Sequence, residues 1–371
     1  MHADFLAPTA IHADAVIGNP PYVSIEQLSA AEKEVYRRDF VTARGRFDLY
    51  TLFFERALGC LRPGGRLVFI TPEKFIYVES SRALRRHIST YSLEELHLID
   101  EATFGDLVTY PVISTLQKTR GEHATRVFSR DGETRLVNLH EREDSWLPLL
   151  RGHQQMPGGR TLGEVCRRIS CGVATGADSV FVQRWEGLPS ELAQFAYPTI
   201  SGRDLPLAGE PVVKYAMLVP YDARGDLLPE ERLGALFGHL TLPSNFERLI
   251  RRTCAKKKPW HAFHENPPLA EILRPKILCK DIGPRPAFVL DRRGVIVPRH
   301  SVYYIVPDDP SLLLPLLNYL NSQVAARWLD AHCQRAANGF LRLQSTVLKR
   351  LPVPAEFSVL APSHLHRVRS A

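Results

Sequence analysis

Four consecutive residues, Asn19-Pro20-Pro21-Tyr22, form a group suited to holding an aromatic amine. The two prolines make the backbone stiff and extended, because each ring restricts φ and lacks an N–H. The Asn19 amide oxygen and the Pro20 carbonyl can then accept together from one exocyclic amino group, while Tyr22 offers a flat face for a base. Two acceptors that hold both N–H bonds favour a pyramidal nitrogen with an available lone pair. The tetrapeptide therefore predicts an activated amine that needs no strong general base; a simple proline turn is the alternative.

The elements around the tetrapeptide indicate an α/β sheet. A short apolar strand, 15–18, runs directly into it, at the kind of strand end where α/β folds bind ligands. Strands alternate with helices over the first 120 residues, and this alternation predicts a parallel sheet. The expected helices are 47–61, which stops at the proline and glycine break 62–65, and 82–88; the further strands are 66–71, 93–99 and 111–116.

The chain is long enough for two domains, at 371 residues. A Gly/Pro/polar stretch, 151–160, predicts a linker between a first domain at 1–150 and a second at 161–356, with a tail at 357–371. The second half mixes short strands and prolines with one late helix, 311–329, and indicates only an α+β architecture.

Charge is unevenly distributed between the two halves. Residues 1–150 hold 18 basic and 21 acidic residues, net −3, whereas the remainder holds 29 and 19, net +10. A basic second domain favours a polyanionic partner, although an ordinary solvated surface explains such clusters equally well. The candidate phosphate-binding residues are Arg203, Arg251, Arg252, Lys256, Lys257, Lys258 and Lys276.

Several classes of protein are disfavoured. No apolar run approaches the ~18 residues of a membrane span, and the first residues lack the basic region of a secretory signal. The six cysteines contain no CxxC pair, which argues against a zinc ribbon or a disulfide scaffold and predicts buried thiols in a reducing cytoplasm. We expect no metal site and no membrane partner.

The segment 13–22 resembles the fourth motif of amino-group DNA methyltransferases, and more narrowly that of the TaqI-like N6-adenine family. Further motifs follow in order: His2-Ala3-Asp4-Phe5-Leu6 resembles the third, 48–50 and 61–72 the fifth and sixth, and Thr109-Tyr110-Pro111-Val112-Ile113 the eighth. The second half is similar to the specificity domain of the same family. Its matching segments are 162–165, 172–178, 202–204, 274–278, 317–322 and 351–354.

This resemblance implies a site-specific, adenine-specific DNA methyltransferase that uses S-adenosylmethionine. Asp4 and Phe5 would contact the adenine of the cofactor, and the tetrapeptide would position N6 of the target adenine. Tyr22 and Tyr110 would clamp that base after it has flipped out of duplex DNA. The choice of adenine N6, rather than cytosine N4, as the methylated atom rests on the resemblance alone. A restriction-modification or phage-defence system is the implied setting, with a cognate restriction endonuclease as a candidate partner.

The first motif of the family, a glycine-rich turn followed by an acidic residue, has no counterpart in this sequence. The resemblance therefore implies a chain truncated at its N-terminus, with only the later strands of a Rossmann-like sheet, followed by the α+β specificity domain. The strand 15–18 would be an exposed edge, and we expect poor solubility or self-association. An upstream chain that completes the cofactor-binding half is a candidate partner.

Two other functions remain open from the sequence. The chain can be a DNA-binding specificity fragment without catalysis, which the missing cofactor motif favours. It can also be an N-methyltransferase that acts on RNA or on a protein glutamine, since related tetrapeptides serve those substrates; the long basic second domain argues against this.

Overall fold

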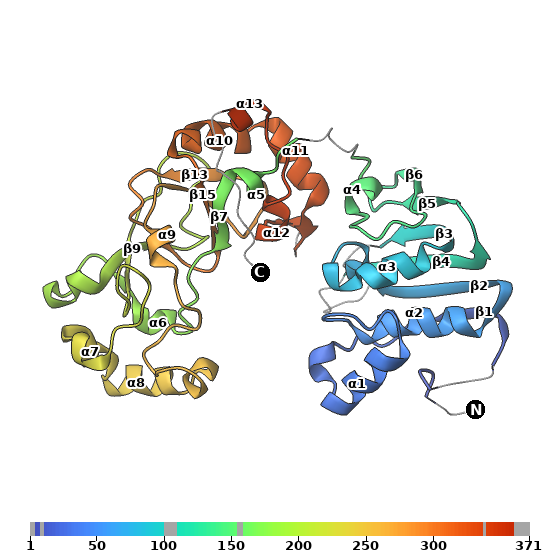
Figure 1. The fold of residues 1–371 in the computed structure, drawn as a ribbon, viewed down its shortest axis with the longest axis horizontal. Helices are drawn as coiled ribbons and strands as arrows, with labels where there is room; N and C mark the ends of the chain where they lie inside the picture. Colours follow the sequence, from blue (N-terminus) through green and yellow to red (C-terminus); the bar gives the residue numbers. More distant parts are fainter. Residues whose placement is uncertain (1–3, 8–10, 100–109, 154–158, 337–338, 360–371) are drawn as a thin grey trace, which may run out of the picture. The chain divides into compact units, whose positions relative to one another are not determined.

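The computed structural model describes residues 4–7, 11–99, 110–153, 159–336 and 339–359. They form two compact units, divided between Gln155 and Met156, and each unit is described here by itself (Figure 1). Half of the predicted linker (154–158) and most of the predicted tail (360–371) lie outside the described residues.

The first unit contains one six-stranded sheet with the strand order β1-β2-β4-β3-β5-β6. Four strands, β1, β2, β3 and β5, run in one direction, while β4 and β6 are antiparallel to their neighbours. The strands are β1 (Ala13–Gly18), β2 (Leu61–Pro72), β3 (Tyr91–Leu98), β4 (Pro111–Arg120), β5 (Ala124–Phe128) and β6 (Thr134–Asn138).

The predicted parallel arrangement is correct for β1, β2 and β3 but wrong for β4, the strand expected at 111–116. Apolar runs indicate where strands lie but not their direction, and β4 inserts antiparallel between β2 and β3, pairing Pro111 with Pro72 and Val112 with Leu98. The predicted exposed edge is confirmed, because β1 ends the sheet and Ile17 on it is 84% exposed. The expected poor solubility stays a prediction.

Helices cover one face of this sheet. Helix α2 (Leu49–Cys60) and helix α3 (Arg82–Ile88) bury apolar side chains against the inward-facing residues of β2 and β4, such as Phe69 and Leu116. Val68, Ile70 and Ile113, which alternate with those residues, are only half-buried. Two further helices are α1 (Ala30–Asp39), which begins with a Ser29–Glu32 capping box, and α4 (Leu147–Leu150).

The second unit is built on two four-stranded sheets and a small three-stranded one, with the orders β14-β9-β10-β8, β13-β11-β15-β7 and β12-β17-β16. Two apolar cores lie within it. Its strands are β7 (Cys166–Cys171), β8 (Val182–Arg184), β9 (Ala196–Ile200), β10 (Tyr215–Leu218), β11 (Lys276–Lys280), β12 (Ile282–Gly283), β13 (Phe288–Asp291), β14 (Val297–Pro298), β15 (Val302–Pro307), β16 (Gln334–Arg335) and β17 (Leu341–Arg342).

The helices of the second unit are short. The predicted single helix 311–329 is wrong, because Asn321 and Ser322 separate two helices, and the Ser322 hydroxyl caps the second by accepting from the Ala325 amide. The helices are α5 (Leu162–Val165), α6 (Asp178–Phe181), α7 (Ala235–Leu240), α8 (Pro243–Ile250), α9 (Leu269–Ile272), α10 (Leu313–Leu320), α11 (Gln323–His332), α12 (Ser345–Leu348) and α13 (Glu356–Val359).

The six cysteines are all free thiols, and five of them are buried; Cys171 is half-buried. Among the described residues, no helix is both long enough and apolar enough to cross a membrane. Within the same ranges, no cluster of three or more His, Cys, Asp or Glu side chains could hold a metal ion.

Candidate active site

The tetrapeptide begins directly after β1, at the carboxyl edge of the first sheet. Gly18 aligns with Phe69 of the parallel strand β2, and a Cβ at Gly18 would lie 3.2 Å from the Phe69 ring. This tight packing places the strand end close against β2. The side chain of Asn19 is exposed, whereas Pro20 is buried. The amide of Asn19 is therefore presented outward on a backbone that is anchored by the following proline.

Tyr22 leans across the end of β2. Its hydroxyl lies 3.4 Å from the Ile70 carbonyl oxygen, to which it donates, and its ring meets the edge of the Tyr50 ring with the centroids 6.4 Å apart. The Leu49 amide donates to the Val23 carbonyl oxygen at 2.8 Å and ties the adjoining backbone to the start of α2. The Tyr22 side chain is 37% exposed, so one part of the ring remains accessible.

Tyr110 lies at the same edge of the sheet. Because β4 is antiparallel to β2, its first residues lie beside the last residues of β2. The Glu73 amide donates to the Tyr110 carbonyl oxygen at 2.8 Å. The sheet thus brings Tyr110 and the tetrapeptide, which are almost 90 residues apart in sequence, to the carboxyl ends of two adjacent parallel strands.

An ion pair between the partly exposed Arg130 and the buried Glu73 supports Tyr110, and sequence reasoning missed it. The Arg130 guanidinium lies 4.7 Å from the centroid of the Tyr110 ring. The same group bonds the Glu73 carboxylate at 2.6 Å and the Ile99 carbonyl oxygen at 3.0 Å. Glu73 is only 5% exposed. Neither residue lies in a recognised segment: Glu73 directly follows the segment 61–72, and Arg130 comes from the turn between β5 and β6.

Tyr22 and Tyr77 are neutral at physiological pH. Partial burial raises the pKa of Tyr22 above its ordinary value. Burial also raises the pKa of Tyr77, and the negative charge of Glu73 adds to that effect. Both hydroxyls therefore stay protonated and do not serve as bases.

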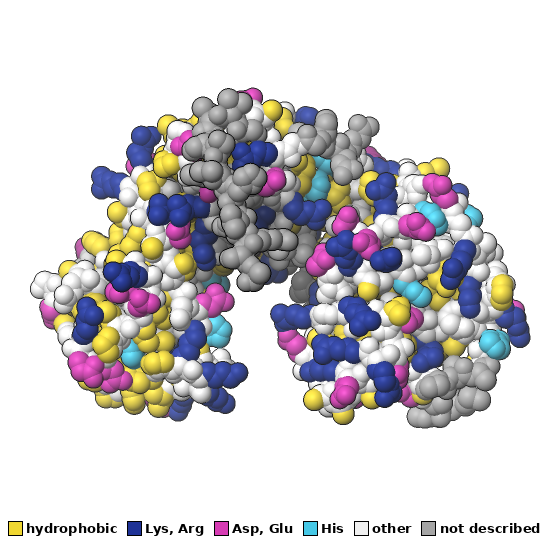
Figure 2. Space-filling view, viewed as in Figure 1, with side chains coloured by type: hydrophobic (Ala, Val, Ile, Leu, Met, Phe, Trp, Pro, Cys, Tyr) yellow, Lys and Arg dark blue, Asp and Glu magenta, His cyan; other side chains and the backbone are white. Residues whose placement is uncertain are grey.

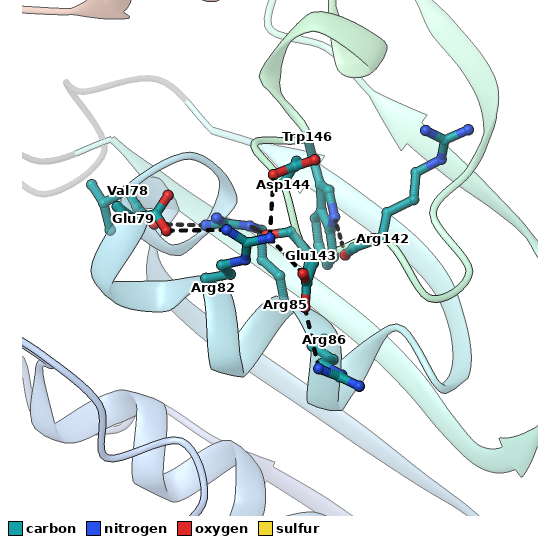
Figure 3. Close-up of polar contacts among 9 residues, drawn as sticks. All are labelled: Val78, Glu79, Arg82, Arg85, Arg86, Arg142, Glu143, Asp144 and Trp146. Atoms are coloured by element: carbon teal, nitrogen blue, oxygen red, sulfur yellow. Dashed lines mark hydrogen bonds and ion pairs between the residues drawn. The ribbon is translucent and has the colours of Figure 1, made fainter. Parts of the chain in front are cut away.

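The loop after β2 is fastened by the buried side chain of Arg85 (Figure 3). Its guanidinium donates to the carbonyl oxygens of Phe75, Val78 and Glu143 at 2.7, 2.8 and 2.9 Å. Burial lowers the pKa of Arg85 to about 10. Around it, Arg82 pairs with the Glu143 carboxylate at 2.5 Å, and Arg86 approaches the same carboxylate. These contacts hold the loop that carries Glu73.

The two predicted cofactor contacts lie against α2. The Phe5 ring stacks on Phe53, with a centroid separation of 5.3 Å. The Asp4 side chain is exposed, and its Oδ1 accepts the Leu6 amide at 3.0 Å. Arg56 from α2 donates to the Leu6 carbonyl oxygen at 2.7 Å and fastens this short segment to the helix.

Five of the seven predicted phosphate-binding residues have side chains at least partly at the surface. Arg203, Lys256 and Lys257 are exposed. Arg251 is exposed but paired with Glu247 at 2.5 Å, and the half-buried Lys258 donates to the His264 carbonyl oxygen and to Asn266. All five remain candidates for contact with phosphates.

The other two predicted phosphate-binding residues, Arg252 and Lys276, are interior, so that prediction is wrong for them. The Arg252 guanidinium donates to three carbonyl oxygens, those of Leu249, Thr175 and Trp260, and its side chain is 9% exposed. Lys276 is fully buried, and its ammonium lies 2.5 Å from the Asp291 carboxylate. The sequence around a single basic residue does not reveal the buried carbonyl oxygens or carboxylates that bind its side chain.

Two protein-family models match separate parts of the chain. The model of the Eco57I restriction-modification methylase family matches residues 9–104, which include the tetrapeptide, and the TaqI-like C-terminal specificity domain matches residues 234–353. The chain therefore joins an Eco57I methylase domain segment to a TaqI-like C-terminal specificity domain, and it is homologous to Type II methyltransferases.

Several relatives align with almost the whole chain, among them two Type II methyltransferases. The Type II methyltransferase M.PaeR7I of Pseudomonas aeruginosa is 28% identical over 97% of this chain, and M.XhoI of Xanthomonas vasicola is 28% identical over 95%. The aligned parts make up 68% and 71% of the length of these two proteins.

One solved structure shares the fold. The Type IIL restriction-modification enzyme MmeI, solved in complex with DNA, superposes with a TM-score of 0.63 at 12% identity. The match covers 91% of this chain and 46% of that protein. At this identity the similarity concerns the fold alone.

Proposed function

We propose that this chain is the methyl-transferring and DNA-recognising part of an adenine-specific DNA methyltransferase of a restriction-modification or phage-defence system. It would act on N6 of an adenine flipped out of duplex DNA, with S-adenosylmethionine as the methyl donor. Residues 1–150 form the methyltransferase part in this proposal, 151–160 a linker, 161–356 the target-recognition domain and 357–371 a tail.

One observation carries the proposal: the exposed Asn19 amide, the half-exposed Tyr22 ring and Tyr110 all belong to the carboxyl edge of one sheet. Strand ends in α/β folds are where ligands bind. An amide oxygen together with two aromatic faces suits a planar base that bears an amino group.

The residues of this edge have distinct roles in the proposed reaction. The Asn19 side-chain oxygen and the Pro20 carbonyl accept the two N–H bonds of the amino group and direct its lone pair out of the ring plane. Pro21 keeps these acceptors in an extended backbone. Tyr22 and Tyr110 hold the base between them, and Arg130, paired with Glu73, supports the Tyr110 ring. Methylation leaves the nitrogen positively charged and acidic, so its proton passes to water, and the neutral Tyr22 hydroxyl does not act as the base.

The described residues fit an adenosine-containing cofactor. Phe5 presents an aromatic ring that is itself stacked on Phe53, and Asp4 keeps an exposed carboxylate, of which only Oδ1 is bonded to the Leu6 amide. An aromatic face for stacking beside a carboxylate that can accept from an amino group suits the adenine moiety. When bound, S-adenosylmethionine supplies an electrophilic methyl group on a sulfonium centre.

The test is the transfer of a labelled methyl group from S-adenosylmethionine to mixed-sequence duplex DNA, with N6-methyladenine identified after digestion. Asn19→Ala should lower transfer on the order of 100-fold, comparable to the loss of one transition-state hydrogen bond in other enzymes, without weakening DNA binding. The control is Asn318→Ala, because Asn318 is also exposed but lies on α10 of the second unit. Normal methylation by Asn19→Ala would contradict the assigned role.

The same assay separates the alternatives. DNA binding by the wild-type chain without any transfer would favour a specificity module that has no catalytic role by itself. Methyl transfer to structured RNA or to a glutamine-containing peptide, in preference to duplex DNA, would favour an N-methyltransferase that acts on RNA or on a protein glutamine. A product containing N4-methylcytosine would mean that the tetrapeptide holds an amino group as proposed but that the target base is cytosine.

A further inference from the structure

The second unit contains a cavity of about 570 Å³ beside β13, an edge strand of one of its sheets. Trp185, which directly follows β8, lines this cavity together with Pro198 of β9 and residues of the segment 290–296, which runs from β13 towards β14. Small-molecule sites in proteins have volumes of roughly 300–1,000 Å³. The cavity is therefore large enough for a small ligand, and the proposed methyl transfer does not use it.

One part of the cavity lining is apolar and includes an aromatic ring. Ile296 belongs to the apolar core of the unit, and Val213 packs against that core. The Trp185 side chain is 45% exposed, although its backbone is held because the Trp185 amide donates to the Lys214 carbonyl oxygen at 2.9 Å. An exposed indole beside apolar side chains suits a flat aromatic ring, which can stack on it.

Two consecutive arginines, Arg292 and Arg293, line the same cavity, and both are exposed. No residue that the structure describes forms an ion pair or a side-chain hydrogen bond with either guanidinium. Lys and Arg side chains are common on the surface of the second unit (Figure 2), so charge alone does not distinguish these two. Their position at an apolar cavity does. A pair of guanidiniums suits a phosphate group, because each can donate two hydrogen bonds to its oxygens.

The turn that carries the two arginines is held from beneath by buried polar groups. The Asp291 carboxylate accepts the amides of Gly294 and Ile296, both at 3.0 Å, and lies 2.5 Å from the buried Lys276 ammonium. Although Asp291 also lines the cavity, Lys276 neutralises its charge, so it does not repel an anion. A turn that is ordered before binding loses little conformational entropy when a ligand binds.

The cavity also offers a hydrogen-bond acceptor. Glu210 is exposed, lines the cavity, and pairs with no cation among the described residues. A carboxylate repels a phosphate but accepts hydrogen bonds from hydroxyl or amino groups. A matching ligand therefore combines an aromatic ring, an anionic group and hydrogen-bond donors.

We infer that this cavity binds a free nucleoside monophosphate. The base stacks on Trp185, the phosphate binds Arg292 and Arg293, and Glu210 accepts from the sugar hydroxyls or an exocyclic amino group. A phosphate monoester carries a charge between about −1.5 and −2 at pH 7, which two arginines match. A phosphodiester of a nucleic acid and an aromatic carboxylate each carry a single charge, and S-adenosylmethionine has no phosphate. The inferred ligand is thus distinct from the DNA and the methyl donor of the proposed function.

Isothermal titration calorimetry of the full chain with AMP, GMP, CMP and UMP, each alone and without DNA, tests the inference. Arg292→Ala and Arg293→Ala should each weaken binding by roughly 10- to 100-fold, as expected for the loss of a hydrogen bond to a charged group. Trp185→Ala should weaken it by roughly 10-fold. The matched control is Arg285→Ala, which should bind normally, because Arg285 is exposed between β12 and β13 but does not line the cavity.

Tryptophan fluorescence locates the bound nucleotide. Of the four tryptophans, Trp146 and Trp328 are buried and Trp260 is half-buried, so Trp185 is the exposed one. A base stacked on its indole should quench the emission of the wild-type chain. Trp185→Phe should lose this quenching and retain most of the affinity measured by calorimetry. The corresponding nucleosides, which lack the phosphate, should bind at least 10-fold more weakly to the wild-type chain.

Each other outcome overturns the inference. These outcomes are the absence of half-saturation below about 1 mM for all four nucleotides, an equal loss of affinity in Arg285→Ala, and nucleosides that bind as tightly as nucleotides. Displacement of the nucleotide by S-adenosylmethionine would assign binding to the cofactor site, and binding of a single-stranded oligonucleotide alone would assign the arginines to nucleic acid. Thermal denaturation verifies that each variant is folded.

The inference and the proposed function fail separately, because the titrations contain neither DNA nor a methyl donor. A chain that binds a nucleoside monophosphate through Arg292 and Arg293 but transfers no methyl group supports the inference and contradicts the proposed function. A chain that methylates DNA but binds none of the four nucleotides does the reverse.

Discussion

Replacing Lys276 with methionine tests whether this lysine is part of the interior, as the structure shows, or part of a DNA-binding surface, as its place in a basic segment suggests. Its ammonium is fully buried and lies 2.5 Å from Asp291. Asp291 also accepts the amides of Gly294 and Ile296, both at 3.0 Å. Burial lowers the pKa of Lys276, while the charge of Asp291 opposes that effect.

The magnitude follows from what Lys276→Met leaves behind. Methionine fills a similar volume, so no large cavity forms, but the Asp291 carboxylate stays buried without its cation. Removing one member of a buried ion pair destabilises a protein by about 3–5 kcal/mol. Because two amides still solvate Asp291, we expect the lower end, about 3 kcal/mol, and for a unit of this size a fall in Tm of roughly 6–12 °C.

Urea and thermal denaturation measure this loss, and DNA anisotropy is measured on the same samples. Lys276→Met should leave the salt dependence of DNA binding unchanged, whereas the exposed control Lys256→Met should lower that dependence and leave stability nearly unchanged. The double variant Lys276→Met/Asp291→Asn should be more stable than Lys276→Met by roughly 1 kcal/mol, because the unpaired charge is gone. Wild-type stability of Lys276→Met together with weakened DNA binding would refute the reasoning.

Three further substitutions test the supports of each unit. Arg85→Met leaves three carbonyl oxygens without their donor and should lower the free energy of unfolding by about 3 kcal/mol in urea denaturation; a loss below 1 kcal/mol would contradict the fastening role. Arg130→Gln should reduce methyl transfer at unchanged DNA affinity, because the Tyr110 ring loses its cation, and Arg130→Lys should retain more activity; equal activities of the two variants would argue against support through charge. Gly294→Ala should destabilise the second unit by more than about 1 kcal/mol in thermal denaturation, since Gly294 has φ +68° and a Cβ there would lie 2.4 Å from the Arg274 carbonyl carbon; an unchanged Tm would show that the turn can relax.

Much of the first unit follows from local pattern. The alternation of apolar strands and helices in 15–116 predicts elements that the structure contains, and the helix predicted to stop at 62–65 ends nearby, at Cys60. Residues 62–65 themselves lie within β2, which begins at Leu61 rather than at the predicted residue 66. The sequence pattern does not predict the direction of a strand or the point at which local hydrogen bonds interrupt a helix. Strand β4 turns antiparallel, and the late helix is interrupted because the Asn321 side chain bonds the backbone of Phe288 while Ser322 caps a new helix.

The sequence by itself determined the chemical character of this protein: the tetrapeptide after a strand, its ordered companion motifs and the basic second half. These are local properties, because a stiff pair of prolines, an amide and an aromatic ring have the same chemistry in any context. Only the tertiary structure decided which distant groups act together. The antiparallel strand β4 brings Tyr110 to the end of β2, and Arg130 arrives from a turn that no motif marks. The tertiary structure likewise decides which lysines and arginines are buried and which are exposed. A charge can be buried only beside partners, and the chain supplies these partners from positions far away in sequence.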